Sequence, residues 1–225
     1  MKTIVKMVGL LCVFALAAGC TGYKSYKKAG YSGFLGEYPE FERGREGVQD
    51  VWIKKDADWN RYDKIMLDEV VFFFKEDSKY KGITADEMKE LSDACAQAYI
   101  DAFRDGYTFT DKPGPDVIRL RIAITGVEKS RPVLNTVSTV LPIGIGLSIV
   151  NKGVTGEHLS VGNSSMEMEA LDSLSSERLA AVVDFRPGAK WEGYTGYGAA
   201  KAAFKFWAKR SRARLDELRG TAPEK

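Results

Sequence analysis

Four carboxylates lie close together in the sequence, and carboxyl groups are well suited to acid–base chemistry. They are Glu167, Glu169, Asp172 and Asp184, and they belong to one predicted hairpin. Glu167 and Glu169 alternate with methionines, so in a strand both side chains point to the same face of the sheet. Paired carboxylates of this kind carry out glycoside hydrolysis. One reading of the pattern is therefore a hydrolase that uses Glu167 or Glu169.

Arginines on the neighbouring predicted strands offer another explanation for these carboxylates. The arginines are Arg119, Arg121, Arg178 and Arg186. Opposite charges on adjacent strands pair across a sheet without any catalysis. We therefore expect cross-strand ion pairs here, and no catalytic residue.

The remaining reactive side chains match no known catalytic or ligand-binding arrangement. His158 is the only histidine, and Cys95 is the only cysteine beyond the first twenty residues. One of each is too few for a Cys/His zinc site. Cys95 lies on the apolar stripe of a predicted helix, which indicates an inert core thiol. We expect no metal, no cofactor and no enzymatic activity.

The N-terminal nineteen residues have the three parts of a secretory signal peptide: a basic start, an apolar run and small residues before a cysteine. The apolar run, Met7–Ala18, is shorter than the ~20 residues of a membrane-spanning helix. Residues Leu16 to Cys20 resemble the lipobox of bacterial lipoproteins. That resemblance implies cleavage between Gly19 and Cys20 and acylation of Cys20. The alternative is a simple secreted protein with a cysteine near its new N-terminus.

The same resemblance indicates which membrane receives the protein. An aspartate after the acylated cysteine is typical of retention at the inner membrane, and this chain has Thr21 there. We therefore expect a lipid anchor in the outer membrane, on its periplasmic face. Loss of Cys12 with the signal peptide and acylation of Cys20 would leave Cys95 without a disulfide partner.

The charge balance bears on possible partners. Without its first nineteen residues, which include two lysines, the chain has 31 basic and 31 acidic side chains. Nucleic-acid binding usually needs a basic surface. We therefore expect no nucleic-acid partner.

The rest of the chain predicts a single domain behind a tether. Residues 20–30 form the lipidated tether, 31–61 an irregular segment that wraps over the domain, 62–218 a single α+β domain and 219–225 a disordered tail. Strands are predicted at 62–75, 117–127, 159–171 and 178–186, from alternating or β-branched residues. Helices are predicted from a capping box at Thr84 and Glu87 to Gly106, and over 197–218. The expected fold is a small, mostly antiparallel or mixed sheet of about four strands with helices packed on one face.

An uncharged segment, Val133 to Val150, interrupts this pattern. It is rich in valine, leucine and isoleucine but contains Pro142, Gly144 and Gly146. Three interpretations remain open: it packs in the core, it forms a self-association surface, or it inserts into a membrane as a hairpin. Proline and glycine make the third less favourable, because backbone exposed to lipid must keep all its hydrogen bonds.

Several spaced motifs resemble one family of bacterial lipoproteins, grouped as "domain of unknown function 3313". The motifs are Ser32-Gly33-Phe34-Leu35 with Tyr38, Tyr62-Asp63-Lys64 before Leu67-Asp68, Pro113-Gly114-Pro115-Asp116, Glu167 through Asp172, and Trp207-Ala208. The resemblance implies an envelope location and a single domain, and it transfers no catalytic residue.

Together these observations favour a non-enzymatic outer-membrane lipoprotein that is a structural or interaction component of the cell envelope. Its partners would be the membrane, through the acyl chains, and itself or another envelope protein, through Val133 to Val150. The alternative is a periplasmic lipoprotein that binds a small or lipid-like ligand in a pocket beneath that segment.

Overall fold

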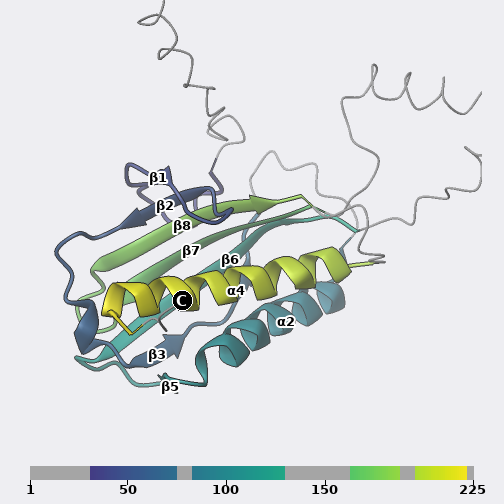
Figure 1. The fold of residues 1–225 in the computed structure, drawn as a ribbon. Coiled ribbons are helices and arrows are strands. Elements are labelled where there is room, and N and C mark those ends of the chain that lie inside the picture. Colours follow the sequence, from purple (N-terminus) through teal and green to yellow (C-terminus); the bar gives the residue numbers. More distant parts are fainter. Residues whose placement is uncertain (1–30, 75–82, 130–162, 188–195, 222–225) are drawn as a thin grey trace, which may run out of the picture. The chain divides into compact units, whose positions relative to one another are not determined.

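The computed structural model describes residues 31–74, 83–129, 163–187 and 196–221 (Figure 1). The predicted signal peptide, Cys20, the tether, His158 and the segment Val133 to Val150 lie outside these ranges. All of the helices and strands described below belong to one unit, Ser32–Lys225.

Three long antiparallel strands form the centre of a mixed sheet. They are β6 (Val117–Val127), β7 (Ser164–Asp172) and β8 (Arg178–Arg186). Five short strands extend it: β1 (Glu42–Arg43), β2 (Asp50–Ile53), β3 (Lys64–Leu67), β4 (Val71–Phe72) and β5 (Thr108–Phe109). The order is β1-β2-β8-β7-β6-β3-β5, and β4 pairs with β6. The predicted α+β class is confirmed, and the eight-stranded sheet is wider than the four strands expected.

Two segments differ from the prediction in their local structure. The described part of the predicted strand 62–75, residues 62–74, is not one continuous strand. The chain leaves β6 after β3 and pairs with it again at β4, where Val71 and Phe72 lie opposite Ala123 and Ile124. The stretch 31–61, expected to be irregular, supplies β1, β2 and a 3₁₀ helix, η3 (Trp59–Arg61). The strand β2 is only four residues long, and its pairing with β8 rather than its own sequence pattern defines it.

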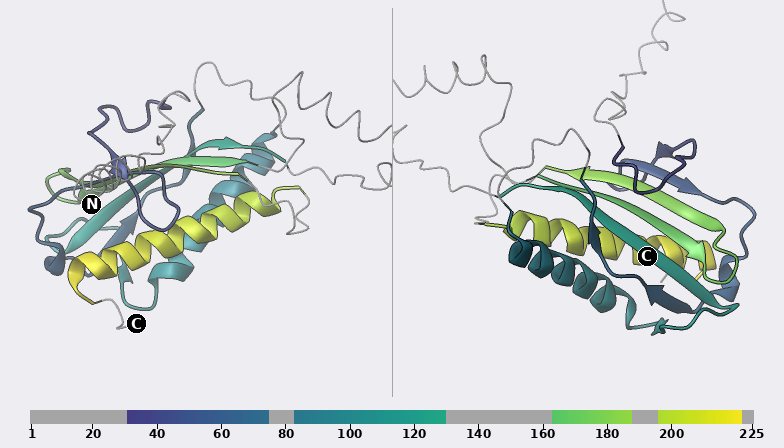
Figure 2. Two further views of the ribbon diagram at one scale, coloured as in Figure 1. Left: turned by 45° about the horizontal axis from the view of Figure 1, so that its top comes forward. Right: turned by 180° about the vertical axis from the view of Figure 1, so that it is seen from behind.

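Both helices cover one face of the sheet (Figures 1 and 2). The helix α2 (Ala85–Phe103) begins with the predicted capping box, in which Thr84 and Glu87 bind each other's backbone N–H groups. The helix α4 (Gly198–Arg219) ends at Gly220, whose φ of 67° suits a residue without a side chain. No helix in the described part of the chain has the length and apolar character required to cross a membrane.

The core lies between these helices and the central strands. Leu91, Cys95 and Tyr99 of α2 and Phe204 and Trp207 of α4 are buried there. Tyr99 donates its hydroxyl hydrogen towards the Met168 sulfur at 3.3 Å, so α2 is tied to β7 by a polar contact within an apolar layer. The helices therefore protect β6 and β7 most fully.

Candidate functional site

Glu169 is held by two arginines, as the sequence predicts. Its side chain is almost fully buried, at 2% exposure, on the sheet face opposite the helices. Arg121 on β6 donates from Nη1 to Oε1, and Arg178 on β8 donates from Nε to Oε2 at 2.8 Å. Both carboxylate oxygens therefore accept from cationic side chains on the two neighbouring strands.

Glu167 has different partners from those predicted. Its Oε1 accepts from the backbone N–H of Ser32 at 2.6 Å, and its Oε2 accepts from the Tyr38 hydroxyl at 2.7 Å. Burial and the bond to Glu167 raise the pKa of Tyr38 to about 12. Residues 32–38, hereafter the strap, are thus pinned onto the outer face of the sheet, and Glu167 serves as their anchor rather than lining a cleft.

The four carboxylates do not form one cluster. Asp184 points to the helix side, where it accepts from Trp207 Nε1 at 2.6 Å and from the Gln49 N–H at 2.9 Å. Burial raises the pKa of the Asp184 carboxyl, and these two hydrogen bonds oppose that rise. Arg186 also departs from the predicted carboxylate pairing, because its guanidinium stacks 3.5 Å from the centre of the Phe206 ring.

Cys95 lies fully buried on α2, in agreement with the prediction of a core thiol. Burial raises its pKa to about 12, so the thiol stays protonated at neutral pH and is a poor nucleophile. Within the described ranges, no group of three histidine, cysteine or acidic side chains is arranged to hold a metal ion.

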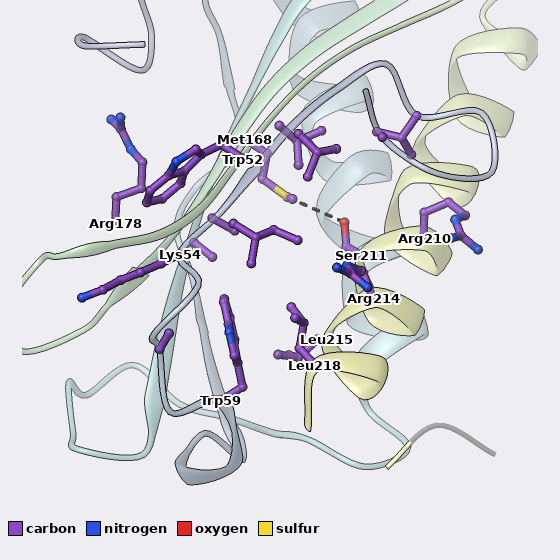
Figure 3. Close-up of a pocket in the computed structure, with 18 of the residues that line it drawn as sticks. Trp52, Lys54, Trp59, Met168, Arg178, Arg210, Ser211, Arg214, Leu215 and Leu218 are labelled. Carbon is purple, nitrogen blue, oxygen red and sulfur yellow. Dashed lines mark hydrogen bonds between the residues drawn. The ribbon is translucent and has the colours of Figure 1, made fainter. Parts of the chain in front are cut away.

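A long groove opens beside α4, where the helices leave part of the sheet uncovered (Figure 3). Two cross-strand rows form its floor. One row is Val51, Val182 and Met168, and the other is Ile53, Ala180 and Ala170. Residues directly opposite one another in paired strands share a face, so each row runs across β2, β8 and β7. The two alanines in the second row leave the floor low.

The walls of the groove come from elements at both of its sides. Ser211, Leu215 and Leu218 of α4 form one side, with Arg210 and Arg214 among the lining residues (Figure 3). Trp59 of η3 is among the lining residues beside Leu215 and Leu218, and the turn between β1 and β2 reaches α4 through an ion pair of Glu46 with Arg210. The groove has a volume of about 1180 Å³ and is open to solvent. Typical small-ligand pockets occupy ~300–1,000 Å³, so this groove can accept a ligand of that size.

The groove is the functional candidate that sequence analysis missed. A ligand pocket was predicted beneath Val133 to Val150, whereas the floor of this groove is supplied by β2, β8 and β7. Its floor depends on β2, which lay in the segment expected to be irregular. The signal that the sequence contains is that Ala180 and Val182 are apolar although they alternate with Leu179 and Ala181, so both faces of this predicted strand have apolar residues.

Comparison with known proteins places the chain in a family and gives distant structural matches. A family described as "Protein of unknown function (DUF3313)" matches residues 30–211. No curated protein matches the chain significantly in sequence.

Among solved structures, a variant of the PelC dodecamer from Paraburkholderia phytofirmans is 12% identical, with a TM-score of 0.41, over 73% of this chain and 97% of that one. A DUF330 protein from Xanthomonas campestris is 11% identical, with a TM-score of 0.37, over 74% and 91%. A DUF4136 protein from Bacteroides thetaiotaomicron is 11% identical, with a TM-score of 0.36, over 75% and 95%. All three likenesses are distant.

Proposed function

We propose that this chain, which belongs to the DUF3313 family, is a non-enzymatic lipoprotein of the outer membrane that binds an amphiphilic molecule in the groove beside α4. The observation that carries the proposal is the apolar floor formed by β2, β8 and β7. The ligand would have an apolar chain and an anionic head.

The floor supports an apolar chain as the bound part. Val51, Ile53, Ala180 and Val182 are all only half-buried, and the last three pack against the core. Covering apolar surface contributes roughly 25 cal/mol per Å². A hydrocarbon chain laid along the two rows would remove this surface from water.

The charged residues along α4 support an anionic head. Arg210 and Arg214 line the groove one helical turn apart. Arg214 donates to Glu217 at 2.7 Å and Arg210 pairs with Glu46, so each retains further guanidinium donors. Arginine binds carboxylate and phosphate oxygens in a planar, two-pronged geometry. A carboxylate or phosphate head would lie against α4 while its tail covers the strands.

Filling the groove tests this function. A Val182→Trp variant should bind a fluorescent fatty acid at least tenfold more weakly than the wild type, because the indole occupies the space over the row of Val51, Val182 and Met168. The measurement is a fluorescence titration of the full-length chain purified in detergent below its critical micelle concentration. Val71→Trp is the matched control, since Val71 also lies on a strand but is 38% exposed and away from the groove.

A separate variant tests whether Arg214 binds the anionic head group of the ligand. Arg214→Gln should weaken binding of the fatty acid severalfold and leave binding of the corresponding fatty alcohol unchanged. Equal affinity of the wild type and Val182→Trp would contradict the groove as the site, as would lipid-free wild-type protein that binds no fatty acid.

A second candidate function is self-association through Val133 to Val150, and the absence of charge in this segment favours it. An unlipidated form that spans Thr21 to Lys225 should be larger than a monomer in light scattering. Deletion of Leu141 to Val150 should reduce it to a monomer. If the intact form is already monomeric and the deletion changes nothing, the self-association hypothesis is wrong.

A further inference from the structure

The outer face of the sheet, opposite the helices, has a second hollow with different chemistry. It encloses about 380 Å³ and is lined by three arginines, one carboxylate and three further residues: Arg119, Arg121, Arg178, Glu169, Leu35, Leu171 and Ser176. It lies on the sheet face seen from behind in Figure 2, beneath the strap. It shares none of the residues that form the groove floor.

The hollow has more positive than negative charge. Its three guanidinium groups face two carboxylates, those of Glu169 and of Asp68, which pairs with Arg119. One positive charge is therefore uncompensated among these groups. Arg119 and Arg121 belong to the same face of β6, two residues apart, which corresponds to roughly 6–7 Å along a strand. Asp68 lies beside both arginines, with its Oδ2 2.8 Å from Arg119 Nη2 and 3.9 Å from Arg121 Nε, so it balances one of the two charges.

The hydrogen bonds of the three arginines show which donors remain. Arg178 has a hydrogen bond from each of its three nitrogens, because Nε donates to Glu169 and Nη1 and Nη2 donate to the carbonyls of Glu37 and Leu35. Arg119 donates from Nε and Nη2 to Asp68, and Arg121 donates from Nη1 to Glu169. Within the described part of the chain, Arg119 Nη1 and Arg121 Nη2 thus have no hydrogen-bond acceptor.

Neither carboxylate accepts a hydrogen bond from these two nitrogens. Both oxygens of Glu169 already accept from arginines. Asp68 is engaged by Arg119 through both oxygens, and its Oδ2 lies 3.9 Å from Arg121 Nε, beyond hydrogen-bonding distance. The site therefore has two guanidinium groups that are held in place by carboxylates and still have free donors.

We propose that this hollow, between Arg119 and Arg121, binds a phosphate group. Arginine forks match phosphate oxygens closely. A phosphate has enough oxygens to accept from both arginines, and its negative charge offsets the surplus positive charge. A water takes up about 30 Å³ in the liquid, so the space admits a phosphate group and ordered water. The group is either free phosphate or the head of an anionic lipid.

Titration of the full-length chain with inorganic phosphate tests the inference. Calorimetry at constant ionic strength should show binding to the wild type that Arg121→Gln weakens at least tenfold. Arg104→Gln is the matched control and should bind as the wild type, because Arg104 lies at the end of α2 with a 64% exposed side chain. Arg121→Lys, which keeps the charge partner of Glu169 but loses the fork, should fall between.

Vesicles distinguish the two sources of the phosphate group. If inorganic phosphate does not bind but vesicles with phosphatidylglycerol bind in a manner that Arg121→Gln abolishes, the ligand is a lipid head. If the wild type and Arg121→Gln are indistinguishable in both assays, the inference is overturned. Val182→Trp should leave phosphate binding unchanged, so failure of the groove proposal would not affect this result.

Discussion

A Cys20→Ser variant expressed in a Gram-negative host is expected to lose all incorporated palmitate. The proposed lipidation needs the Cys20 sulfur, and a serine hydroxyl does not replace it. Each buried CH₂ contributes ~0.8 kcal/mol to membrane binding, so two or three acyl chains hold a protein essentially permanently. Metabolic labelling with palmitate, followed by the mass of the N-terminal peptide, measures the change.

Two cysteine variants provide the controls for this experiment. Cys12→Ser should remain fully labelled, because Cys12 lies inside the predicted signal peptide. Cys95→Ser should also remain labelled, since Cys95 is buried in the core. Replacement of residues 1–20 by the leader of a soluble periplasmic protein should move the chain out of the membrane fraction. Palmitate on the Cys20→Ser chain would show that the lipobox assignment is wrong.

Lipidation would place both proposed sites within reach of a bilayer. Ser32, the first residue pinned to the sheet, follows Cys20 by twelve positions. An extended chain spans at most ~3.3–3.6 Å per residue, so the tether can reach roughly 40 Å. An amphiphile for the groove and a phosphate head for the outer hollow are then both available from the same membrane.

Regular patterns made the long elements predictable. Isoleucine and leucine recur at every second position from Ile118 to Ile124, and the structure has β6 over residues 117–127. The arm at 178–186 is likewise β8, and Thr84 with Glu87 marked the start of α2. The sequence of each segment is enough to predict it, because hydrophobic periodicity and a capping box are local properties of the chain.

Short elements that depend on tertiary pairing were not predictable. The strands β2 and β4 contain four and two residues, too few for a period. The groove was missed for the same reason, since its floor requires β2 beside β8. The same distinction applies to the partners of the two glutamates. Glu169 pairs with arginines on adjacent strands, as the sequence predicts, whereas Glu167 binds Ser32, which is 135 residues away in the sequence.

The second large effect is expected at Asp172, whose side chain closes the turn between β7 and β8. It is only 3% exposed. It accepts from Tyr62 at 2.9 Å and from the Ser175 N–H at 2.8 Å, and it pairs with Arg61. Asp172→Ala leaves these donors without an acceptor, so we expect a loss of about 3 kcal/mol in the free energy of unfolding at pH 7. Urea denaturation measures it.

The pH dependence of the unfolding free energy tests whether the charge of Asp172 causes this stabilisation. Burial opposes ionisation of Asp172, but the hydrogen bonds from Ser175, Tyr62 and Arg61 outweigh it and hold its pKa well below the ordinary value. A carboxyl with a lowered pKa in the folded state stabilises the fold above its unfolded pKa of about 3.9. This contribution declines as the pH falls below that value.

Asp172→Asn separates the charge from the shape of the side chain. Its deficit in unfolding free energy relative to the wild type should be largest near pH 7 and should shrink as the pH falls below about 4. Asp93→Asn is the control, because Asp93 is 65% exposed and pairs only with Lys89 on the surface of α2. A deficit for Asp172→Asn that stays constant from pH 7 to pH 3 would assign the effect to side-chain geometry. A deficit that shrinks shows that the ionised carboxylate holds the β7–β8 turn against Tyr62 and Arg61. The same contact then helps to position β8, which contributes residues to both the groove and the outer hollow.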